Sequence, residues 1–86
     1  LNGIDVQFHK IEESLKDDKY DNVVANILSD TVINISPNLK KLTRKRLAIS
    51  GILIDQVERV IDAYSNWICL KVSDRIDNWV LIDGEL

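Results

Sequence analysis

The 86-residue chain has few of the residues from which catalytic and metal sites are usually built. It contains one cysteine, one histidine and three glycines. A single cysteine excludes an internal disulfide, and one histidine with one cysteine cannot supply a zinc site at the usual ligand spacing. The three glycines, Gly3, Gly51 and Gly84, stand too far apart for a phosphate-binding loop. We therefore expect no metal and no other cofactor.

Catalysis has equally little support in the sequence. His9 falls in a segment with helical spacing, where a lone histidine is typical of a surface position. Acidic pairs such as Glu12-Glu13 lack any sign of the apolar pocket that raises a carboxyl pKa for acid–base work. Cys69 stands between two apolar neighbours and is expected to be a buried thiol that packs like a small hydrophobe. We therefore predict that the protein is not an enzyme.

Long apolar runs and a strong excess of one charge are also missing. No stretch approaches the roughly 18 apolar residues of a membrane helix, and no signal peptide is visible, so no membrane partner is expected. The net charge of −3 opposes nucleic-acid binding over the whole surface. The scarcity of cysteine favours an intracellular, reducing compartment, cytoplasmic or nuclear. Because the chain opens on Leu1, we expect a fragment of a larger protein or a processed one.

The composition that remains is that of an ordinary globular domain. Apolar residues make up 45% of the chain and charged residues 29%. A chain of 86 residues has the length of one domain, which we expect to span residues 1–86.

Apolar residues recur at helical spacing along most of the chain. The spacing predicts a first helix from Val6 to Leu15 and a second through Tyr20–Ile35. The β-branched residues near the end of the second segment lower its helix propensity, so a short strand over Thr31–Ile35 is the alternative. A last helical segment is predicted through Trp67–Ile82.

The central helix has the clearest start. Ser36 and Pro37 are typical of the cap and the first position of a helix, so a boundary is predicted there. A nearly all-round apolar series follows from Leu47 to Trp67, and a helix reaching that far would span about 45 Å. A domain of this length is roughly 30 Å across. The helix therefore either breaks at Ser50-Gly51 or packs against a partner or a second copy. The fold class predicted is all-α, a small bundle of three to five helices with a long apolar central helix starting at Ser36-Pro37.

A basic run lies near the start of this central helix. Its five cations, within seven residues, are candidate contacts to phosphates. A helix-turn-helix over Arg46–Ile61 is disfavoured, because apolar Leu53 and Ile54 occupy positions that should face the DNA groove. The candidate phosphate contacts are Lys40, Lys41, Arg44, Lys45 and Arg46.

The surplus of apolar surface gives the leading functional hypothesis. We expect a non-catalytic protein–protein interaction or self-association module, whose partner is another protein or a second copy of itself. The alternative is a nucleic-acid-associated regulatory domain that uses the basic run. Trp67 is expected in the core, whereas Trp79 lies in a four-residue apolar run that cannot face one core on a helix. The predicted interface residues are Leu53, Val57, Val60, Tyr64, Trp79 and Leu81.

Overall fold

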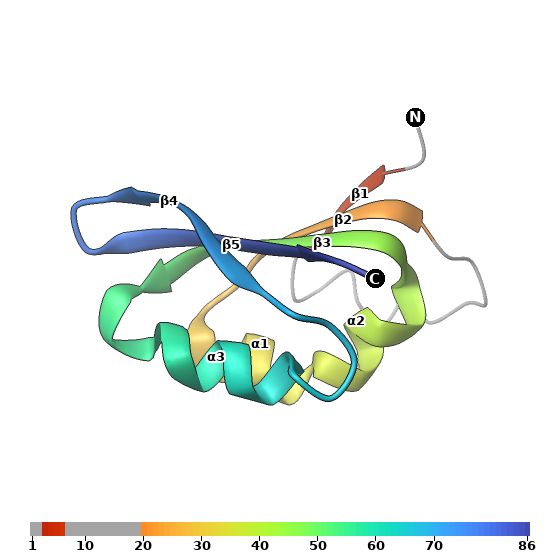
Figure 1. Ribbon diagram of the computed structural model, residues 1–86, viewed down its shortest axis with the longest axis horizontal. Coiled ribbons are helices and arrows are strands. Elements are labelled where there is room, and N and C mark those ends of the chain that lie inside the picture. Colours follow the sequence, from red (N-terminus) through yellow and green to blue (C-terminus); the bar gives the residue numbers. More distant parts are fainter. Residues whose placement is uncertain (1–2, 7–19) are drawn as a thin grey trace.

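A mixed five-stranded sheet with three helices on one side takes the place of the predicted bundle (Figure 1). The computed structural model describes residues 3–6 and 20–86. The strands are β1 (Gly3–Val6), β2 (Tyr20–Asn26), β3 (Thr43–Leu53), β4 (Lys71–Ile76) and β5 (Trp79–Glu85). The helices are α1 (Ser29–Asn34), α2 (Ser36–Leu42) and α3 (Val57–Tyr64), the last preceded by the 3₁₀ turn η2 (Ile54–Gln56).

The strand order is β1-β2-β3-β5-β4. Strands β1, β2 and β3 run parallel, and β5 runs antiparallel to both of its neighbours, β3 and β4. The helical connection α1–α2 links the parallel strands β2 and β3, as a crossover must. The two-residue turn Asp77-Asn78 joins β4 to β5. Asp77 has a φ of 54°, a left-handed conformation that aspartate tolerates better than most residues.

Alternation of buried and exposed residues explains why the chain forms strands where helices were predicted. In β2, Val23 and Ala25 are buried while Val24 between them is exposed. In β3, Leu47 and Ile49 are buried on the same side of the sheet. A two-residue period fits a strand with one covered face, and isoleucine and valine favour that geometry. The all-α prediction is therefore wrong.

The central helix is much shorter than predicted. A helix does begin at Ser36, with Pro37 in its first turn, but it ends at Leu42, and Thr43 is already extended. The residues from Leu47 onward then belong to β3 and not to the same helix. Gly51 does not kink a helix: its φ of 78° coincides with a register shift in the pairing of β3 with β5, where the strand bulges.

The other predicted helices also differ from the structure. The first falls largely on residues 7–19, which lie outside the described residues. The second is replaced by β2 and α1, and the alternative strand over Thr31–Ile35 is wrong because α1 covers most of it. The last is replaced by the hairpin β4–β5.

The core fills the space between the sheet and its three helices. Tyr64 of α3 is fully buried, and its hydroxyl donates a 2.6 Å hydrogen bond to the carbonyl of Val32 in α1. Ser36 does not cap its helix with its side chain. Its hydroxyl accepts a 2.9 Å bond from Trp67 Nε1, and it donates a 3.4 Å bond to the carbonyl of Ala63. The start of α2 is thereby tied to the end of α3, and Trp67 packs partly buried on the core.

Gly84 of β5 marks the closest approach of two backbone segments. A Cβ at this position would lie 2.3 Å from the carbonyl oxygen of Cys69. Only glycine fits there, because the obstacle is backbone and cannot rotate away. Gly51 differs, since a Cβ there would meet the side-chain oxygen of Asn26 at 2.8 Å, which can move.

We expect Gly84→Ala to lower the free energy of unfolding by about 2 kcal/mol, because the added methyl group overpacks against Cys69. Gly51→Ala should cost about 1 kcal/mol through its left-handed backbone. Urea unfolding followed by tryptophan fluorescence measures both. A loss at Gly84 no larger than that at Gly51 would contradict this account of the β5 packing.

Burial raises the pKa of Tyr64 above its ordinary value of 10.0. The folded state therefore keeps the proton that the unfolded chain releases above pH 10, so this contribution to stability is intact below pH 10 and declines as pH rises further. We expect Tyr64→Phe to remove a pH dependence of up to about 1.4 kcal/mol per unit above pH 10. Urea unfolding of both proteins between pH 9 and 11 measures it, and parallel pH profiles would show that Tyr64 is not held neutral by the fold.

Candidate protein-binding face

One face of the sheet has no described element over it. The three helices lie on the opposite side of the sheet (Figure 1). Side chains alternate along a strand, so those between the buried residues point away from the helices. Several of these are apolar: Trp79 is 51% exposed, Ile76 70% and Val24 40%. We call this surface the open face, and define it by Val24 of β2, Ala48 and Ser50 of β3, Asp74 and Ile76 of β4, and Trp79, Leu81 and Asp83 of β5.

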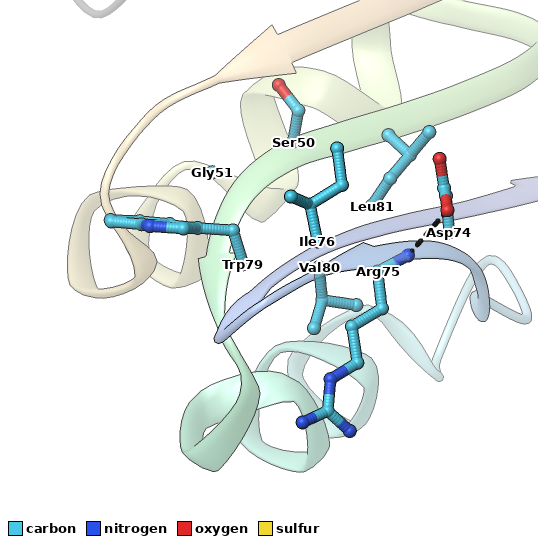
Figure 2. A pocket seen from close by; sticks show the side chains of 8 residues that line it. All are labelled: Ser50, Gly51, Asp74, Arg75, Ile76, Trp79, Val80 and Leu81. Carbon is cyan, nitrogen blue, oxygen red and sulfur yellow. Dashed lines mark hydrogen bonds between the residues drawn. The ribbon is translucent and has the colours of Figure 1, made fainter.

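A shallow hollow of about 160 Å³ lies where the hairpin β4–β5 meets β3. Figure 2 shows Ser50, Asp74, Ile76 and Leu81 projecting to the open side, while the side chains of Arg75 and Val80 point to the helix side. Cross-strand pairing sets this arrangement, since Ile76 lies opposite Trp79 and Asp74 opposite Leu81. A register shift between Val72 and Asp74 brings Asp74 onto the open face.

Two further hollows adjoin the first. One of about 190 Å³ lies beyond Trp79, between the bulge at Gly51 and the loop residue Leu28, which is 74% exposed. Another of about 250 Å³ is lined by Val24, Ala48 and Leu81. Trp79 lines the first two hollows and Leu81 the first and third, so the three form one continuous uneven surface.

Charged residues lie at one end of the open face. Arg46 forms an ion pair with Asp83, and this hydrogen bond raises the pKa of the Arg46 guanidinium. Lys71 lies opposite Asp83 in the pairing of β4 with β5. The open face therefore runs from an aromatic and aliphatic end at Trp79 to a charged end at Arg46.

The structure brings only half of the predicted interface residues together. Trp79 and Leu81 lie on the open face, and Leu53 lines the hollow beyond Trp79. Val57, Val60 and Tyr64 are instead buried in the core, because they form the inner face of a short helix packed on the sheet.

The basic run is divided between a helix and a strand. Lys40 and Lys41 are exposed in the last turn of α2, and the other three belong to β3. Arg44 forms a 2.6 Å ion pair with Asp21 on the neighbouring strand, much as Arg46 pairs with Asp83. The run therefore does not form the single cationic helix face that the phosphate hypothesis assumed.

The remaining predictions from the sequence concern Cys69, His9, metal ligands and membrane-spanning helices. Cys69 is exposed and not buried. His9 lies outside the described residues. Within residues 3–6 and 20–86, no three acidic, histidine or cysteine side chains gather as metal ligands. None of the described helices has the length and hydropathy to span a bilayer.

Val24, Ser50, Asp74 and Ile76 belong to the open face and were not predicted. A signal for the last two is present in the sequence. Asp77-Asn78 is a pair of turn residues between two short stretches that carry strand-favouring side chains, among them Val72, Ile76 and Trp79, which is typical of a two-residue hairpin.

The whole chain resembles a known enzyme family. The sequence model of "Ribosomal protein L11 methyltransferase (PrmA)" matches residues 1–86. The chain belongs to the ribosomal protein L11 methyltransferase family. Among similar proteins, the ribosomal protein L11 methyltransferase of Dechloromonas aromatica is 41% identical over 68 residues, which are 77% of this chain and 23% of that protein. The one of Methylobacillus flagellatus is 35% identical over 85 residues, 96% of this chain and 28% of that protein.

A solved structure supports the fold. The crystal structure of ribosomal protein L11 methylase from Lactobacillus delbrueckii subsp. bulgaricus matches with a TM-score of 0.70 and 23% identity, over 83% of this chain and 38% of that one. The chain spans about a quarter of the length of the curated relatives it matches.

Membership in the L11 methyltransferase family overturns the predicted function. The prediction of a non-catalytic protein–protein interaction or self-association module is wrong, and so is the alternative of a nucleic-acid-associated regulatory domain, because the relatives are named as methyltransferases. The prediction that the protein is not an enzyme is wrong for the same reason. The residue types of this chain do not exclude catalysis by its relatives, because the chain matches only about a quarter of their length.

Proposed function

We propose that the chain is part of an enzyme that transfers a methyl group to ribosomal protein L11, and that its open face contacts this protein substrate. The relatives' names carry the first half of the proposal. The open face carries the second half, with Trp79 as its principal observation: a tryptophan 51% exposed beside Ile76 at 70%. Large aromatic side chains anchor protein interfaces because they bury much apolar area at small cost in conformational entropy.

The shape of the open face also suits a protein more than a small molecule. Its hollows are shallow and adjoin one another across four strands. A small-molecule site encloses most of its ligand, whereas a protein partner covers a broad surface with an apolar centre and a polar rim. Trp79, Ile76 and Leu81 supply such a centre, and the ion pair of Arg46 with Asp83 stands at its edge.

This proposal also sets the partner and the location. The partner is a different protein and not a second copy of the chain. The location is intracellular, in the bacterial cytoplasm, where a ribosomal protein is made and assembled.

We expect Trp79→Ala to weaken the binding of purified ribosomal protein L11 to this chain by at least about tenfold, because truncating a central aromatic anchor costs on the order of 2 kcal/mol. Isothermal titration calorimetry measures the Kd. Val72→Ala is the matched control: Val72 is 52% exposed on the same hairpin but pairs with Ile82 on the helix side.

The control should bind L11 as the unaltered chain does, and both variants should keep a cooperative thermal unfolding transition. An unchanged Kd for a folded Trp79→Ala chain would reject the open face as the contact surface. No measurable binding by the unaltered chain would reject its role in holding L11.

A further inference from the structure

The hollow beside Trp79 combines two kinds of group that together fit a basic side chain. Its apolar lining comes from Ile76, Trp79 and Leu81, and its one acidic group is Asp74. Figure 2 shows Ile76 and Leu81 projecting from the open side between the indole and the carboxylate. A lysine or arginine side chain has the same sequence of parts, an aliphatic stem that ends in a cation.

The carboxylate of Asp74 is held in place by the backbone. One of its oxygens accepts a 2.7 Å hydrogen bond from the amide of Arg75. The guanidinium of Arg75 does not compete for Asp74, because its Nε donates to the carbonyl of Asp77 at 2.8 Å and its side chain points to the helix side (Figure 2). Asp74 lines the hollow, and no salt bridge joins it to a residue in the described part of the chain.

The other acidic groups of this surface are differently placed. Asp83 forms its ion pair with Arg46, and Glu85 lies close enough to the same guanidinium to interact with it. Charge at that end of the open face is thus balanced within the chain. Asp74 differs from these two, because it stands at the border of the apolar lining of the hollow and not beside Arg46.

We infer that this hollow receives a basic side chain of ribosomal protein L11, whose aliphatic stem lies over Ile76 and Leu81 and whose cation pairs with Asp74. Trp79 closes the opposite, apolar end of the hollow, where the base of the stem would lie. This inference rests on the proposed function, because it names the group of the substrate protein that the open face selects. The carboxylate of Asp74 makes the site prefer positively charged side chains, whereas an apolar patch alone does not distinguish the sign of a charge.

The test compares Asp74→Asn with Asp74→Glu in the 86-residue chain. Asparagine keeps an oxygen that can accept from the Arg75 amide, so the local backbone is preserved while the charge is removed. We expect Asp74→Asn to weaken L11 binding about threefold to tenfold at 50 mM salt, and by less at 500 mM salt, because screening weakens exposed ion pairs. Asp74→Glu should stay within about twofold of the unaltered chain.

Glu58→Gln is the matched control, since it removes the same charge from an exposed position on α3, across the molecule from the open face. Loss of binding in Asp74→Asn, absent from Glu58→Gln, supports the inference. If Asp74→Asn and Glu58→Gln weaken binding equally, the effect comes from the net charge of the chain, and the inference is overturned. If Trp79→Ala weakens binding while Asp74→Asn does not, the basic side chain is rejected and the proposed function stands.

Discussion

The pairing of β3 with both of its neighbours is the constraint on which the rest of the structure depends. This strand joins the parallel part of the sheet, through β2, to the antiparallel hairpin, through β5. Its side chains Leu47, Ile49 and Ile52 are fully buried against the helices. Each contributes roughly 2 kcal/mol of hydrophobic stabilisation on burial, so the strand also anchors the core. Without β3 the two parts of the sheet would share no hydrogen bonds.

The same strand shapes the open face. On that side, beyond Arg46, it carries the small side chains of Ala48 and Ser50, followed by the bulge at Gly51. Its neighbours carry larger groups, such as Val24 on β2 and Leu81 on β5. Small residues along a central strand between larger ones leave hollows, which is why the three hollows adjoin β3. One strand therefore contributes to the core on one face of the sheet and determines the shape of the open face on the other.

The sequence allowed part of this to be predicted. A helix start next to Pro37 is local, because proline restricts the backbone whatever the tertiary fold. The structure begins α2 at Ser36, one residue before the predicted first position, with Ile35 and not Ser36 as the cap. The run from Leu47 to Ile54 was misjudged, because apolar residues spaced two and three apart around a bulged glycine fit a helical period nearly as well as a strand. Strand pairing is non-local, so neither the order β1-β2-β3-β5-β4 nor the placement of Asp74 and Trp79 around one hollow follows from spacing. The exposure of apolar residues at Trp79 and Leu81 could be predicted, because the four consecutive apolar residues Trp79–Ile82 cannot all lie on one face of a helix.

Two tasks are divided between the two faces of the sheet. The helix side carries most of the packing, with Tyr64, Ser36 and Trp67 joining the helices to one another. The open face contributes less to stability, since Trp79 and Ile76 remain largely exposed in the isolated chain. Substitutions there should alter binding with small effects on folding, whereas substitutions such as Gly84→Ala should do the reverse. For the proposed contact with a substrate protein, this separation lets the residues of the open face vary without loss of the fold that presents them.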